Sequence, residues 1–112
     1  MFEQRATDLV SLSVERGRPT VRGSCCLATS QLITRWVNSF EDHGLDIDLS
    51  GVTFFDSCGL RAFLGARVNR HKLRVVNPSR CVVRVLRITG TYGYLVYGSR
   101  TFDEPDYAVS TN

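Results

Sequence analysis

The chain has 112 residues, of which 43% are hydrophobic and 22% charged, with a formal net charge of +3. This length and composition suit one globular domain and exclude a disordered chain, so we predict a single domain over residues 1–112 with a structured core at about 9–97. The 14 basic residues are scattered, which argues against a continuous basic surface for binding nucleic acid. No stretch reaches the roughly 18 apolar residues that a membrane-spanning helix needs.

The first residues lack the basic and apolar segments of a secretory signal, so we expect a cytoplasmic protein. Its four cysteines are then expected to be reduced. They form no Cys-x-x-Cys pair, and neither a metal site nor a cofactor is predicted. His43 and His71 stand alone, and no nucleophile elbow or phosphate-binding glycine loop is present, so no enzymatic activity is predicted.

In chain order, the first predicted elements are two strands. Apolar residues alternate with serines over residues 10–14, which is the period of a half-buried strand. Residues 15–18 are typical of a turn. Residues 20–22 resume extended structure, so the two segments predict a hairpin.

Helices and strands then alternate. The three strand–helix–strand units imply right-handed crossovers and a largely parallel sheet, and polar residues 100–112 are expected to form a flexible tail. The first of these elements is a helix capped by Thr29 or Ser30, with apolar residues to Phe40, and it leads to a strand over 45–49 whose apolar run continues through Phe54 and Phe55. A second helix begins at Ser57 and leads to a strand over 73–76; its inner face carries Leu60, Phe63, Leu64, Arg67 and Val68. A third helix lies between Ser79 and Gly90, with Arg80, Arg84 and Arg87 outside, and a strand over 94–97 follows it. Trp36 and the phenylalanines are predicted in the core, while the Arg67 head group should reach solvent.

One segment carries a recognisable motif. Residues 48–61 have the sequence DLSGVTFFDSCGLR, which closely resembles the signature of the STAS domain family (sulfate transporters and anti-sigma factor antagonists). In that family a strand ending in Asp-Leu-Ser leads to an Asp-Ser-Ser/Ala-Gly-Leu turn that opens a helix. Residues 75–79 and 85–90 are also similar to the family pattern, so the resemblance runs from about Leu9 to Val96. It implies an α/β fold: a mixed β-sheet of about five strands with three to four helices packed on it.

Ser57 lies where a strand ends and a helix begins. Unpaired N–H groups at a helix start favour an anion, so a phosphate on Ser57 would be tolerated there and would add about two negative charges to an exposed loop. Taken alone, Ser57 or Asp56 is a helix cap. The resemblance implies more, since the serine at this position is the phosphoacceptor of the antagonist branch. Gly59 should allow close backbone approach, Leu60 should face the core, and Arg61 is the better contact candidate.

Two departures from the family pattern stand near this motif. Antagonists commonly carry Gly-Glu-Leu/Ile-Asp where this chain has Gly23-Ser24-Cys25-Cys26, so both acids are absent. Cys58 stands where the family usually has Ser or Ala. The family fold would bring these thiols close, so a Cys26–Cys58 or Cys25–Cys58 disulfide is one hypothesis, and small buried cysteines are the other. Cys81 is expected to serve packing.

By this resemblance the protein is an anti-sigma factor antagonist. It would bind an anti-sigma factor with serine kinase activity, be released by phosphorylation of Ser57, be reset by a phosphatase, and regulate transcription without touching nucleic acid. We expect a monomer or weak dimer. Two alternatives stay open: a STAS subunit docking on the ATPase of an ABC-type lipid transport complex, and a scaffold subunit of a stress-sensing assembly. The predicted partner-binding residues are Asp56, Ser57, Cys58, Gly59, Arg61, Ser24 and Cys26.

Overall fold

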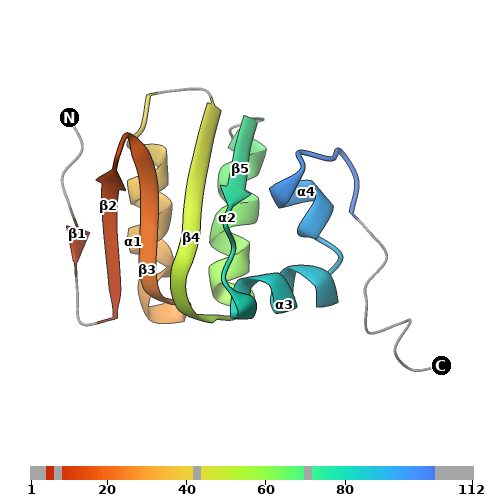
Figure 1. The fold of residues 1–112 in the computed structure, drawn as a ribbon, viewed down its shortest axis with the longest axis horizontal. Helices are drawn as coiled ribbons and strands as arrows, with labels where there is room; N and C mark the ends of the chain where they lie inside the picture. The colour runs from red at the N-terminus through yellow and green to blue at the C-terminus, as the bar shows by residue number, and fades with distance from the viewer. Residues whose placement is uncertain (1–4, 7–8, 42–43, 70–71, 103–112) are drawn as a thin grey trace.

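A five-stranded mixed sheet forms the centre of the molecule in the computed structural model, which describes residues 5–6, 9–41, 44–69 and 72–102. The first three strands are antiparallel, whereas the third, fourth and fifth are parallel. The predicted α/β class and mixed sheet are confirmed. In spatial order the strands are β1 (Arg5–Ala6), β2 (Val10–Glu15), β3 (Arg18–Cys25), β4 (Gly44–Phe55) and β5 (Lys72–Val76) (Figure 1).

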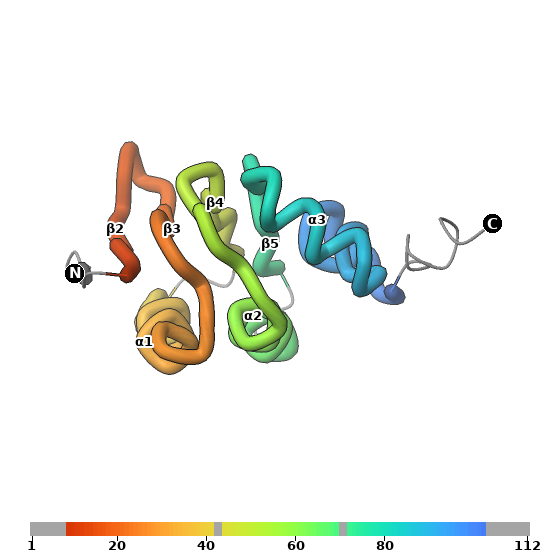
Figure 2. Tube along the Cα trace, turned by 90° about the horizontal axis from the view of Figure 1, so that it is seen from below, coloured from red at the N-terminus to blue at the C-terminus, as the bar shows by residue number. Residues whose placement is uncertain are grey.

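Four helices surround the sheet on one face and at one edge. The helices α1 (Leu27–Asn38) and α2 (Ser57–Asn69) lie side by side on one face, as Figure 2 shows from below. The helices α3 (Arg80–Ile88) and α4 (Tyr92–Val96) lie beyond β5. No helix of the described residues is long and apolar enough to cross a membrane.

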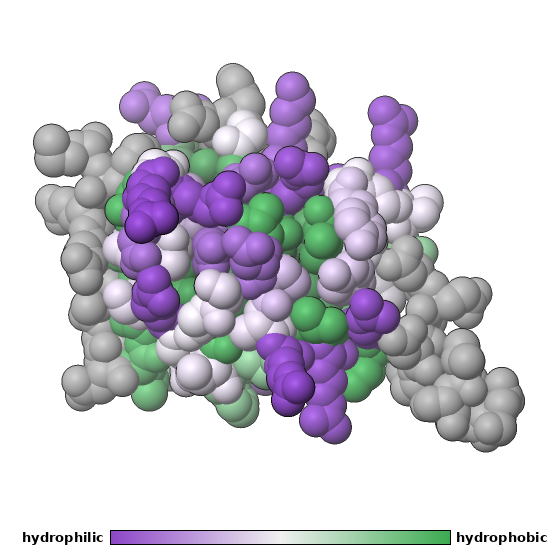
Figure 3. All heavy atoms as spheres, viewed as in Figure 1, coloured by the Kyte–Doolittle hydropathy of each residue, from purple (hydrophilic) through white to green (hydrophobic). Residues whose placement is uncertain are grey.

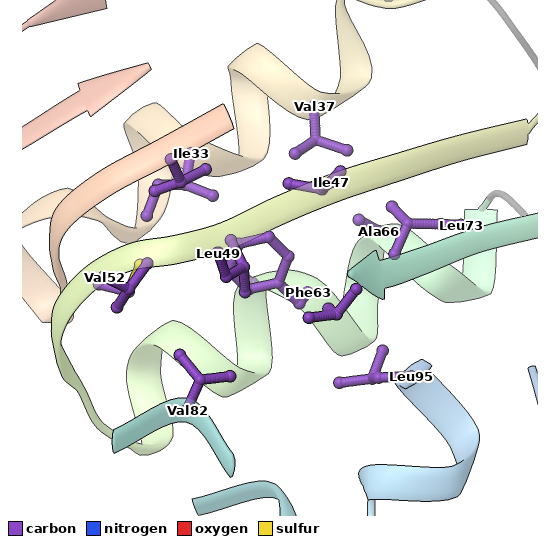
Figure 4. Close-up of a cluster of buried hydrophobic side chains, with 14 of the residues drawn as sticks. Ile33, Val37, Ile47, Leu49, Val52, Phe63, Ala66, Leu73, Val82 and Leu95 are labelled. Atoms are coloured by element: carbon purple, nitrogen blue, oxygen red, sulfur yellow. The ribbon is translucent and has the colours of Figure 1, made fainter. Parts of the chain in front are cut away.

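The core lies between the sheet and the two covering helices. Figure 4 shows Ile33 and Val37 of α1 and Phe63 of α2 directed toward Ile47 and Leu49 of β4, and all five are fully buried. The opposite face of the sheet faces solvent. Cross-strand ion pairs join polar side chains there, Arg22–Glu15 and Arg74–Asp46. Figure 3 looks onto this face, where hydrophilic residues gather over the strands. The two faces thus follow the period-two alternation predicted from the sequence.

The predicted strand over 94–97 is wrong, because this segment belongs to helix α4. Leu95 N–H donates to Thr91 O at 3.0 Å and Tyr97 N–H donates to Gly93 O at 3.0 Å, which are helical bonds. Leu95 is fully buried against the core. Aromatic and β-branched residues favour strands only weakly, and tertiary packing overrides that preference here. The fifth strand is instead β1, which was not predicted.

The ends of the helices agree only in part with the predictions. The first helix begins at Leu27, so Cys26 is its N-cap, and Thr29 lies at the third helical position and accepts the Cys26 N–H at 3.0 Å. Thr29 and Ser30 are therefore not the caps. The third helix is preceded by Ser79, as predicted, and Gly90 follows its last turn with a φ of +73°.

Four side chains lie on the opposite side from the one predicted. Arg67 does not reach solvent: it is 7% exposed, and its guanidinium donates to Leu73 O at 3.1 Å, Gly98 O at 3.2 Å and Ser99 O at 3.3 Å. Val68, predicted inside, is 65% exposed. Of the predicted aromatic core, Trp36, Phe40, Phe55 and Phe63 are buried, but Phe54 and Phe102 are exposed.

Candidate functional site

Two strand-to-helix turns meet at the lower edge of the sheet in Figure 1. The turn after β3 leads to α1 and the turn after β4 leads to α2. Cys25 pairs with Phe55 in the parallel register, and Asp56 N–H donates to Cys25 O at 3.3 Å. Because neighbouring parallel strands end at the same edge, the segment from Ser24 to Cys26 lies beside the motif turn.

Ser57 is the first residue of α2 and is exposed to solvent. Asp56 precedes it and caps the helix, since its Oδ1 accepts the N–H groups of Cys58 at 2.9 Å and Gly59 at 3.1 Å. The predicted capping role of Asp56 is confirmed. The expectation that unpaired N–H groups would receive a phosphate needs correction, because the Asp56 carboxylate already occupies two of them. Like charges repel, so a phosphate on Ser57 would project away from Asp56 into solvent.

Gly59 holds the two turns together. A Cβ atom at this position would lie 2.8 Å from Cys25 Cβ and closer still to Cys25 O, so the backbone of α2 touches β3 only because no side chain intervenes. The predicted close approach is confirmed, and the residue is buried. Leu60, 6% exposed, faces the core as predicted, whereas Arg61 is exposed.

Two apolar side chains that the sequence interpretation missed lie open to solvent at this edge. Leu27 is 75% exposed at the start of α1, and Phe54 is 50% exposed near the end of β4. The register of β3 and β4 explains Phe54: Gly23 pairs with Val52 but Ser24 pairs with Phe54, so Thr53 is the extra residue of a bulge. An earlier shift, between Thr20 and Arg22, turns Val52 inward, and the second shift returns Phe54 to the outward side.

A groove of about 550 Å³ runs between α1 and α2, starting at this edge. Leu27 and Cys58 line it at the end next to Ser57, and Arg35 and Arg61 line it farther along. Two of the predicted contact residues, Cys58 and Arg61, therefore belong to the same concave surface. Ser57 and Cys26 directly precede the lining residues Cys58 and Leu27 in the chain, so they stand at its mouth.

The cysteines differ in burial, and Cys25 is the fully buried one. All four are free thiols: Cys25, Cys26, Cys58 and Cys81. Burial, reinforced by the neighbouring Cys81 and Cys26 thiols, raises the pKa of Cys25 to about 12. Cys26 and Cys58 are half-buried. Since the thiolate is the reacting species, Cys25 is the least suited to disulfide formation.

Mild oxidation tests the hypothesis that Cys26 and Cys58 form a disulfide, and it should leave buried Cys25 reduced. Intact-mass measurement should show the loss of two hydrogens, and peptide mapping should identify the pair. A Cys58→Ser variant should keep its full mass, while Cys81→Ser should behave like the unsubstituted chain. A mass loss that persists in Cys58→Ser would eliminate this pair.

Within the described part of the chain, no three or more His, Cys, Asp or Glu residues are grouped so that they would hold a metal ion. His43 and His71 lie outside the described residues.

Comparison with known proteins identifies the family pattern over most of the chain. The family model described as the STAS domain matches residues 18–108, a range that includes both turns and the groove. A search of curated proteins finds no match.

Proposed function

Because the chain belongs to the STAS domain family, we propose that it is an anti-sigma factor antagonist switched by phosphorylation of Ser57. It would bind an anti-sigma factor with serine kinase activity, and so regulate transcription indirectly from the cytoplasm. The observation that carries the proposal is the exposure of Ser57 at the first turn of α2, between a capping carboxylate and exposed apolar side chains.

The surroundings of Ser57 suit a reversible contact. Leu27 and Phe54 offer apolar area that a partner would cover, which favours binding while Ser57 is unmodified. A phosphate adds about two negative charges beside the Asp56 carboxylate. An apolar or acidic partner surface would then have to desolvate or approach these charges, so its affinity falls.

In this proposal the protein has no catalytic activity of its own. The partner kinase supplies ATP and its metal, and a serine phosphatase restores the binding form. Ser24 and Cys26 replace acids at this edge, so Asp56 is the carboxylate that remains between the two turns. That difference favours a partner whose own surface here is neutral or acidic.

Incubation with candidate anti-sigma factor kinases and ATP, followed by phosphosite mapping, tests the proposal. We expect phosphate on Ser57 and none in Ser57→Ala. Calorimetric titration with the same kinase should give equal affinity for the unsubstituted chain and Ser57→Ala. Affinity should be about tenfold lower for Ser57→Glu, which corresponds to about 1.4 kcal/mol. Thr53→Ala, which removes another exposed hydroxyl at this edge, is the control and should be phosphorylated normally.

Three outcomes would count against this function. Equal affinities for the unsubstituted chain, Ser57→Ala and Ser57→Glu would remove Ser57 from the mechanism. Recovery of an ABC-type ATPase in place of a kinase would favour the transport subunit, and sedimentation as a large self-assembly would favour the scaffold.

A further inference from the structure

The helices carry charge of one sign. None of the four helices described contains Asp or Glu, and the described carboxylates all lie on strands or in loops: Glu15, Glu41, Asp46, Asp48 and Asp56. The arginines of the helices are Arg35, Arg61, Arg67, Arg80, Arg84 and Arg87. On the open sheet face, by contrast, cations pair with anions. The helical surface is therefore the part of the described molecule that lacks compensating negative charge.

Two of these arginines stand in the groove between α1 and α2. Arg35 and Arg61 are exposed, line the groove from opposite helices, and have no carboxylate partner among the described residues. The rest of the lining combines small side chains such as Ser30 and Ala62 with the amides of Gln31 and Asn69. The groove is thus a concave, weakly polar surface flanked by two positive charges that no described carboxylate neutralises, and it is continuous with the Ser57 edge through Cys58.

Gly65, at the middle of α2, lines the same groove. A Cβ atom there would meet nothing within 4 Å, so the fold has no steric need for glycine at this position. Glycine inside a helix is less favourable than alanine, so its presence here has no benefit for the helix itself. The space above it is open to another molecule, and a side chain placed there would fill the groove without disturbing the core.

We propose that this groove binds an acidic amphipathic helix of the protein partner, whose carboxylates pair with Arg35 and Arg61. The inference rests on the proposed function, since it describes how the partner that docks at Ser57 continues along the molecule. Small side chains allow a helix backbone to approach closely, and the apolar face of such a helix would cover Leu27 and Ala62. Phosphate on Ser57 would add negative charge at the mouth of the groove and repel the same segment.

The charge count favours a protein partner over nucleic acid or membrane. A nucleic-acid site commonly neutralises about 6–10 phosphates, and a lipid-binding cluster needs about 4–8 basic residues. Among the residues that the structure describes, Arg35 and Arg61 are the two cations of the groove, and they lie on opposite walls.

A synthetic amphipathic helix with leucine and alanine on one face and glutamate on its flanks serves as the probe. It is titrated into the isotope-labelled full chain by NMR, beside a matched peptide with lysine in place of glutamate. We expect amide shifts at Ser30, Arg61 and Gly65 with the glutamate peptide only. Arg35→Glu and Arg61→Glu should each lower its affinity about tenfold, and Gly65→Leu should abolish binding in a chain that remains folded.

Arg84→Glu on α3 is the matched control, because it makes the same charge change outside the groove and should leave the affinity unchanged. Shifts centred elsewhere, or equal binding of the lysine peptide, overturn the proposal. Phosphatidylglycerol vesicles and single-stranded DNA form two further arms. Tighter binding of either one at the same amides would replace the protein partner with a lipid or nucleic-acid one.

The kinase assay separates this inference from the proposed function. If Arg35→Glu and Arg61→Glu bind the kinase and are phosphorylated on Ser57 like the unsubstituted chain, the groove proposal fails and the switch stands. If no kinase modifies Ser57, the switch fails, and the peptide titration still decides whether the groove binds an acidic helix.

Discussion

Gly59→Ala is expected to lower the free energy of unfolding by about 2 kcal/mol, because the new methyl group would collide with Cys25 at a rigid contact between α2 and β3. The oxygen in its way belongs to the backbone, so relief requires the two turns to move apart. That movement would also displace Asp56, whose N–H donates a hydrogen bond to Cys25 O, and with it the neighbouring Ser57. Urea unfolding followed by the fluorescence of buried Trp36 measures the change, and kinase binding should weaken in parallel.

Gly65→Ala supplies the matched control on the same helix. Its methyl group meets open space, so this variant should be more stable than the unsubstituted chain by about 0.4–1 kcal/mol. Opposite signs at the two glycines would confirm that Gly59 serves contact between elements. Equal stabilisation at both positions would show that the two turns separate freely, and the site would then lack the rigid edge described here.

Arg67→Ala is expected to destabilise the fold by about 3 kcal/mol. Its guanidinium donates hydrogen bonds to carbonyl oxygens of β5 and of the segment after α4. It also stacks on Tyr94, at 4.7 Å from the ring centroid. Removing it leaves three carbonyls without a charged donor, each worth about 1–3 kcal/mol where water does not replace it. Thermal and urea unfolding give the measurement.

Val68→Ala is the control for this prediction. It changes the next residue of the same helix, which is 65% exposed, and should alter stability by less than about 0.5 kcal/mol. If Arg67→Ala unfolds at the same urea concentration as Val68→Ala, water satisfies the carbonyls and Arg67 does not join α2 to the C-terminal segment.

Where apolar residues recur with the period of a strand or a helix over several residues, the sequence predicted the structure well. The hairpin of β2 and β3, the core face of α1 and the Asp56 cap were all predicted correctly, since each depends on spacing along the chain. The prediction for residues 94–97 failed because this short apolar run, three of whose four residues are aromatic or β-branched, fits a strand or a helix equally well. Their helical state depends on Leu95 reaching the core, which is a tertiary contact.

The motif around Ser57 was likewise recognisable from residue order, and it led to the family and to the exposed turn. The surface around that turn could not be recognised from residue order. Two shifts in the pairing of β3 with β4 leave Val52 buried and Phe54 outward. Two separate helices form the groove, and its arginines have no carboxylate partner among the described residues. Local propensity and side-chain period act over a few residues, so the chain alone determined most of its elements and its phosphoacceptor candidate. Long-range packing decided which side chains remain uncovered, because burial is settled only when distant segments meet.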